Sequence, residues 1–238
     1  VSIDDVPERF YPFGKLAAHV AGFVGPNGAD AGESGHYGLE EFYNAVLSGA
    51  SGSGGTSLPS VGENIALTLD PSIQIEAERI LEHLVETHNA KGGSVIVEDP
   101  KTGKILAMGG YPNFDPNAYS ESPVANFLNP IVQQIYEPGS VFKAITMAAG
   151  IDSGKITPQT TYVDTGSLTI NGRTIQNYDV KTHGPYGVAT MTNVIEHSIN
   201  TGAVFAERQI GRDIFTRYVK SFGFDEKTGI DLPGELSG

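Results

Sequence analysis

Hydrophobic and polar positions follow regular patterns from residue 62 onward. Residues 64–70 alternate apolar and polar side chains, which is typical of a half-buried strand. Asp70 and Pro71 then predict the start of a helix, because Asp caps free N–H groups and Pro suits the first helical position. This helix is expected to run to about Asn89. Its apolar residues recur at helical spacing, at Ile73, Ala77, Ile80, Leu81 and Leu84.

Two hairpins are expected further along the chain. Residues 94–99 (SVIVED) and 104–110 (KILAMGG) are β-rich runs joined by a Pro-Lys-Thr-Gly turn. Residues 167–177 carry Asn171-Gly172 at their centre, a pair that favours the type I′ turn of a tight hairpin.

Residues 111–135, rich in Asn and Pro, are expected to be loop-like, and helical patterns follow them. A helix is expected to start near Ser140, with Val141, Ile145, Ala148 and Ala149 buried. Two more helical patterns cover about 190–209 and 212–221. The elements do not alternate as βαβ units, so the pattern predicts an α+β fold in which an antiparallel sheet packs against helices.

The first 61 residues differ in texture. Short apolar clusters are separated by Gly-rich turns, and residues 48–60 (SGASGSGGTSLPS) form a low-complexity Gly/Ser segment. This segment is either a natural loop or a junction that replaces a longer excursion. The composition shift predicts a domain boundary between residues 1–61 and 62–238.

Composition excludes several classes of function. With 15 Lys+Arg against 28 Asp+Glu, the net charge of −13 argues against nucleic acid as a partner and disfavours anionic membrane surfaces. The chain has no Cys, so no disulfide or thiolate chemistry is available, and its six His lack metal-ligand spacing. No cofactor and no metal are expected. No apolar run is long enough to span a membrane, and the opening residues are typical of an internal start.

Ser140 and Lys143 form the first candidate site. Glu137-Pro138-Gly139 precedes them directly, which places Ser140 at the start of a helix, and side chains three apart share one helix face. Serine needs a neighbouring base to act as a nucleophile, and a lysine whose pKa is lowered by burial can serve. The alternative is a Ser N-cap followed by an exposed Lys.

Ser198 and Asn200 form the second candidate pair. They lie two apart at an expected break between helical segments, so both can point into one cleft. There, Ser198 could relay a proton and Asn200 could hold a substrate carbonyl. The alternative is a polar helix break with local backbone bonds. Asp164 and Asp179 flank a hairpin and are expected to be turn or surface acids.

The combination of these motifs resembles class B penicillin-binding proteins, the monofunctional peptidoglycan D,D-transpeptidases. The resemblance is carried by YEPGSVFK around Ser140 and covers nearly the whole chain in family order. Residues 9–25 and 38–49 are similar to the N-terminal pedestal region of the family. Residues 64–81, 92–117 and 228–235 are similar to its transpeptidase domain, which has the fold of serine β-lactamases.

The resemblance implies roles for the candidate residues. Ser140 would form the acyl-enzyme with the penultimate D-alanine of a stem peptide, and β-lactams would acylate the same residue. Lys143 would deprotonate Ser140, Ser198 would transfer protons and Asn200 would bind the substrate amide. The family also implies a polytopic membrane glycosyltransferase partner within the cell-wall synthesis complex. It implies an extracytoplasmic (periplasmic) location on the bacterial plasma membrane through an N-terminal anchor.

The family's third motif, Lys-Ser/Thr-Gly after the second motif, has no match here. Lys101-Thr102-Gly103 precedes Ser140 and lies in a hairpin turn, and Lys227-Thr228-Gly229 runs into another family segment. The chain is therefore expected to end before the third motif. Two alternatives stay open: a catalytically silent fragment that acts only as a structural or partner-binding module, and a serine β-lactamase or β-lactam sensor.

Overall fold

The computed structural model describes residues 9–27, 32–49 and 62–238 of the chain. Most of the predicted Gly/Ser segment lies outside the described residues. Every strand pairing within the described ranges is antiparallel. The predicted α+β class, with an antiparallel sheet and helices, is therefore confirmed.

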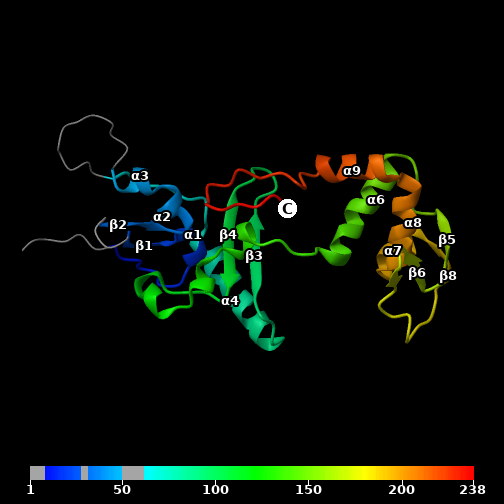
Figure 1. Ribbon diagram of the computed structural model, residues 1–238, viewed down its shortest axis with the longest axis horizontal. Helices are drawn as coiled ribbons and strands as arrows, with labels where there is room; N and C mark the ends of the chain where they lie inside the picture. Colours follow the sequence, from blue (N-terminus) through cyan, green and yellow to red (C-terminus); the bar gives the residue numbers. More distant parts are fainter. Residues whose placement is uncertain (1–8, 28–31, 50–61) are drawn as a thin grey trace, which may run out of the picture. The chain divides into compact units, whose positions relative to one another are not determined.

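The described chain divides into two compact units (Figure 1). Unit 1 holds the described residues up to Gln134 together with Gly229–Leu236, and unit 2 holds Ile135–Thr228 with Ser237–Gly238. This division is distinct from the predicted pedestal boundary at residues 61/62, which stays a prediction.

An aromatic cluster organises the first part of unit 1. Phe23 stacks on Tyr119 with ring centroids 4.1 Å apart and meets Phe127 edge-on at 5.0 Å. Phe114, only 1% exposed, completes the buried core of this cluster with Ala18. The surrounding elements are α1 (Ala18–Ala21), β1 (Phe23–Pro26), β2 (Glu33–His36), α2 (Gly38–Phe42), α3 (Asn44–Leu47), the 3₁₀ turns η1 (Pro116–Glu121) and η2 (Val124–Phe127), and α5 (Pro130–Gln133).

Helix α4 (Pro71–Thr87) packs on the hairpin of β3 (Gly93–Glu98) and β4 (Ile105–Tyr111). Asp70 accepts from the N–H groups of Ser72 and Ile73, so the predicted cap is confirmed. The predicted strand over residues 64–70 is wrong. Asp70 N–H donates to Leu106 O, but residues 64–70 form no strand ladder within the described part of the chain.

The buried stripe of α4 differs from the predicted one. Ala77 and Leu81 are buried as expected, whereas Ile80 and Leu84 are 43% and 48% exposed. The helix is rotated so that a polar residue, Gln74, is buried and only 2% exposed. The predicted face thus overlaps the buried one at Ala77 and Leu81 but is rotated away from Gln74 and Val85.

Unit 2 contains both of the remaining strand pairs. The predicted hairpin at Asn171-Gly172 is confirmed, with φ of 50° and 78° at the two turn residues. The second pair joins strands on either side of that hairpin. The elements are η3 (Gly139–Val141), α6 (Phe142–Asp152), β5 (Thr161–Asp164), β6 (Ser167–Ile170), β7 (Arg173–Gln176), β8 (Gly187–Thr190), α7 (Met191–Glu196), α8 (Asn200–Ile210) and α9 (Arg212–Ser221).

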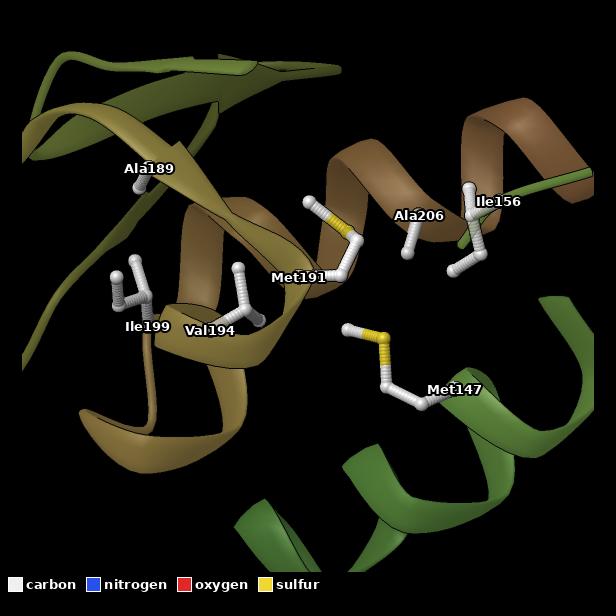
Figure 2. Packing of buried hydrophobic residues seen from close by; sticks show 7 residues of the cluster. All are labelled: Met147, Ile156, Ala189, Met191, Val194, Ile199 and Ala206. Carbon is white, nitrogen blue, oxygen red and sulfur yellow. The ribbon is translucent and has the colours of Figure 1, made fainter. Parts of the chain in front are cut away.

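The core of unit 2 is aliphatic and methionine-rich (Figure 2). Met147 on α6 faces Met191 at the start of α7, and both side chains are at most 6% exposed. Val194 and Ile199 are fully buried beside them. This core joins α6 to the α7–α8 segment, the two parts of unit 2 that carry the candidate residues.

None of the helices in the described ranges is both long enough and apolar enough to cross a membrane.

Candidate active site

Ser140 lies at the start of the helical segment that includes α6, as predicted. Gly139, with φ of 61°, adopts the left-handed conformation that turns the chain into η3. Ser140 follows on this 3₁₀ turn and is exposed. Val141 is 74% exposed, so its predicted burial is wrong. It belongs to the 3₁₀ turn, where three residues complete a turn, and is therefore out of phase with the buried face of α6.

Lys143 occupies the first turn of α6 and is only 8% exposed. The alternative of an exposed lysine after a Ser cap is wrong. Its ammonium nitrogen donates to Ser198 O at 2.6 Å, Asn200 Oδ1 at 2.7 Å and Ser198 Oγ at 2.9 Å. Three acceptors match the three donors of an ammonium group.

Ser198 and Asn200 lie at the break between α7 and α8, as predicted. Ser198 has φ of 52°, a left-handed conformation that ends α7 and redirects the chain. Ile199 is fully buried and anchors the break in the core, and Asn200 is the first residue of α8. Because the side chain between them is buried, both polar side chains are turned toward α6.

The structure brings all four candidate residues together. Ser198 Oγ lies 2.8 Å from Ser140 Oγ and 2.9 Å from Lys143 Nζ. The hydrogen bonds therefore link Ser140 to Lys143 through Ser198. Each serine hydroxyl can rotate, so either Ser140 or Ser198 can be the donor in the hydrogen bond between them.

Burial controls the electrostatics of Lys143. Desolvation lowers its pKa below the ordinary value of 10.5, since the charged form is the one that loses water. All three of its acceptors are neutral oxygens, and within the described chain no carboxylate pairs with it. A lysine in this setting can exchange a proton with a neighbouring hydroxyl.

Asp164 and Asn177 are functional candidates that the sequence did not reveal. Asp164 was expected to be a turn or surface acid; it is 2% exposed, so the surface alternative is wrong. Asn177, 1% exposed, was not singled out, and it accepts from the backbone N–H of Asn200 at 3.0 Å. Neither lies in a motif; the only signal was their place at strand ends.

Tyr178 and Tyr136 project from the segments that carry the site and are 77% and 80% exposed. At this exposure, Tyr136 does not pack against the Ser140 helix. Phe142 does pack there, with its ring 5.1 Å from that of Phe224. Within the described ranges, no cluster of three or more His, Asp or Glu side chains could hold a metal ion.

Comparison with protein families identifies the same region. The profile described as the penicillin binding protein transpeptidase domain matches residues 93–238. Stage V sporulation protein D of Bacillus subtilis is 34% identical over 248 residues. That match covers 97% of this chain and 37% of the relative. Peptidoglycan D,D-transpeptidase MrdA of Acinetobacter baumannii is 29% identical, and its match covers 100% of this chain and 40% of that protein.

Solved structures agree with these matches. The crystal structure of penicillin binding protein 3 from Mycobacterium tuberculosis superposes with a TM-score of 0.82 at 31% identity. The superposition covers 97% of this chain and 50% of that one. A complex of the same protein with ampicillin gives the same TM-score. The chain thus spans 37% and 40% of these two curated relatives and about half of the solved chain.

Proposed function

The chain belongs to the penicillin-binding protein transpeptidase family, and we propose that it carries the acylating machinery of a peptidoglycan D,D-transpeptidase. The observation that carries the proposal is the hydrogen-bonded series Ser140 Oγ, Ser198 Oγ and Lys143 Nζ, with separations of 2.8 Å and 2.9 Å. A nucleophile, a relay and a base within hydrogen-bond reach are what serine acyl transfer requires.

The proton path follows from the donors and acceptors around Lys143. In the neutral amine, two N–H groups donate to Ser198 O and Asn200 Oδ1, and the lone pair faces Ser198 Oγ. Ser198 then gives its hydroxyl proton to Lys143 while taking that of Ser140. The resulting ammonium keeps all three partners. The lowered pKa of Lys143 favours the neutral starting form, so acylation gains rate as pH rises toward the ordinary lysine range.

The proposed substrate is a stem peptide that ends in D-Ala-D-Ala. Ser140 Oγ attacks the carbonyl of the penultimate D-alanine, the ester forms, and the terminal D-alanine leaves with the proton returned by Lys143 through Ser198. The amine of a second stem peptide then displaces Ser140 and forms the cross-link. Ser140 is exposed and can be reached, and N–H groups at the start of its helix can stabilise the oxyanion.

A β-lactam is proposed to enter the same path. Its ring amide is attacked by Ser140 and opens, but the leaving nitrogen stays tethered to the acyl group and blocks the second amine. The ampicillin complex of the similar penicillin binding protein 3 supports this assignment. By family membership, we further propose an extracytoplasmic place of action at the plasma membrane and a polytopic glycosyltransferase as partner.

Labelling with a fluorescent penicillin tests the proposal. We expect one label per molecule, located at Ser140 by peptide mass spectrometry, and none in Ser140→Ala. Ser153→Ala is the matched control: Ser153 caps the other end of α6, bonds only carbonyls of that helix, and should leave labelling unchanged.

Each other outcome has a distinct meaning. Label retained in Ser140→Ala would overturn the assignment of the nucleophile. A folded chain that takes no label would favour the catalytically silent fragment, and fast turnover of a chromogenic β-lactam would favour a β-lactamase.

A further inference from the structure

A buried carboxylate lies behind the Ser198–Asn200 segment. Asp164 ends β5, is 2% exposed and takes no part in the proposed proton path. It accepts from the backbone N–H of Gly166 at 3.0 Å and of Tyr186 at 2.8 Å, and from Thr201 Oγ1 at 2.5 Å. Asn177 Nδ2 reaches both of its oxygens, at 3.1 Å and 3.0 Å. All of these donors are neutral, and within the described residues no basic side chain pairs with it.

Asp164 determines which way the Asn177 amide faces. A carboxylate only accepts hydrogen bonds, so the NH₂ group of Asn177 must point toward it. The amide oxygen is then left on the opposite side, where it accepts from Asn200 N–H at 3.0 Å and Thr201 N–H at 3.2 Å. A flipped amide would set its NH₂ group against the N–H donors of Asn200 and Thr201, and its oxygen against the acceptor oxygens of Asp164.

The Asn177 oxygen acts as the cap of α8. The first N–H groups of a helix have no acceptor within the helix, and Ser, Thr, Asn or Asp at the N-cap normally supplies one. Here the N-cap is Ile199, whose side chain is apolar and packed in the core. Asn177, 23 residues upstream, supplies the missing acceptor.

The capped residue is the one that bonds Lys143. Asn200 Oδ1 accepts from Lys143 Nζ at 2.7 Å, and Asn200 Nδ2 donates to Gln176 O at 2.8 Å. Ser198, two residues earlier, is carried by the same backbone. Fixing the Asn200 backbone therefore fixes the two side chains that meet Lys143.

We propose that Asp164 is a positioning residue of this site, which acts by orienting the Asn177 amide so that it holds Asn200 and Ser198 against Lys143. This inference rests on the proposed function, because it assigns Asp164 to the acylation of Ser140. Displacement of reacting groups by about 1 Å can lower a rate about 100-fold, so a small shift of this segment should be visible in kinetics.

The test exchanges the carboxylate and the amide. Asp164→Asn and Asn177→Asp are each expected to lower the acylation rate constant with a fluorescent penicillin at least tenfold. In the first, two NH₂ groups meet; in the second, two carboxylates meet. The double variant Asp164→Asn/Asn177→Asp restores a donor facing an acceptor and an acceptor facing Asn200 N–H. Its rate should return to within about threefold of the unmodified protein.

Stability should not follow the same course. In the double variant, Asp164→Asn still replaces one carboxylate oxygen by an NH₂ group, so one of the backbone N–H groups that donate to Asp164, such as that of Tyr186, loses its acceptor. The unfolding midpoint should therefore stay below that of the unmodified protein. A residue that only stabilises the fold would lower rate and stability together and recover both together. The acylation rate constant is calculated for the molecules that become labelled. The folded fraction is measured separately, as the final extent of labelling.

Hydrogen exchange gives a readout that does not need activity. The amides of Asn200 and Thr201 should exchange faster in each single variant and be protected again in the double variant. If the unmodified protein takes no penicillin, the proposed function fails, and these exchange rates decide the positioning role alone. Single-variant rates within threefold of normal, a double variant no faster than the singles, or unchanged amide exchange would each overturn the inference.

Discussion

A buried side-chain amide bonds the backbone in each unit of the molecule, Gln74 in unit 1 and Asn177 in unit 2, and the two are held differently. Gln74 in unit 1 is 2% exposed and bonds both polar groups of Met108 on β4: it accepts from the N–H at 2.8 Å and donates to the C=O at 2.9 Å. Its NH₂ group also reaches Glu78 at 2.6 Å. The oxygen of Asn177 in unit 2 meets donors alone among the described residues: the N–H groups of Asn200 and Thr201 and, at 3.3 Å, the Thr201 hydroxyl.

This difference decides what each neighbouring carboxylate does. Gln74 is oriented by the backbone alone, because one N–H and one C=O of the same residue fix both ends of its amide. Glu78 adds a further acceptor. The NH₂ end of Asn177 is held by Asp164, since the backbone N–H groups that Asn177 meets bind only its oxygen. The same pair of side-chain types thus completes a strand edge in unit 1 and holds the candidate active site in unit 2.

The largest expected effects come from deleting each amide. Gln74→Leu leaves two backbone groups of Met108 buried without partners and should lower the free energy of unfolding by about 2–4 kcal/mol. Asn177→Leu should cost a similar amount. The two variants separate in kinetics: penicillin acylation per folded molecule should be unchanged in Gln74→Leu and at least tenfold slower in Asn177→Leu. Equal rates in both variants would remove the distinction between the two amides.

The two carboxylates should respond to acid in opposite directions. Burial raises the pKa of Asp164, but hydrogen bonds from Thr201, Tyr186 N–H, Gly166 N–H and Asn177 outweigh it, and the pKa lies below 3.8. Its contribution to stability is therefore present above pH 3.8 and is lost as pH falls through the lower folded-state pKa. The cost of Asp164→Asn, measured by denaturant unfolding, should shrink along that fall.

Glu78 has the reverse sign. Burial raises its pKa above 4.5, and the N–H of Ala17 and the amide of Gln74 offset this only in part. Its contribution is full below pH 4.5 and is lost as pH rises through the folded-state pKa. The cost of Glu78→Gln should therefore be greatest in acid and decline toward neutrality. Parallel pH curves for the two variants would contradict the assignment of both carboxylates.

Local signals were enough to predict the candidate active residues. Asn171-Gly172 specifies its own turn through two positive φ angles, and Asp70 caps a helix that begins at the next residue. Ser140 and Ser198 likewise lie at helix ends that adjacent residues define. Each of these features is determined by residues that lie within a few positions of one another, and a sequence pattern shows such neighbours directly.

The supports behind the site could not be predicted in this way. Asp164 bonds Thr201, 37 residues away, and the β6–β7 hairpin lies between them. Gln74 is buried because Met108, 34 residues away, needs a partner, and its burial turned α4 out of its expected phase. Buried polar groups are chosen by the partners that the fold brings to them, and a hydropathy pattern does not contain that information.

The smallest expected effect concerns Thr201, the second side-chain donor to Asp164; among the described residues, the one side-chain donor to Glu78 is Gln74. Thr201→Val keeps the shape of the side chain but removes the hydroxyl that donates to Asp164. We expect a loss of about 1 kcal/mol in unfolding free energy and a fall of only a few-fold in acylation rate, because the bond from Asn177 to Asp164 remains. Thr201→Ser keeps the hydroxyl and is the matched control. If Thr201→Val slowed acylation as much as Asp164→Asn, the hydroxyl rather than the Asn177 amide would be the link that holds Asn200 in place.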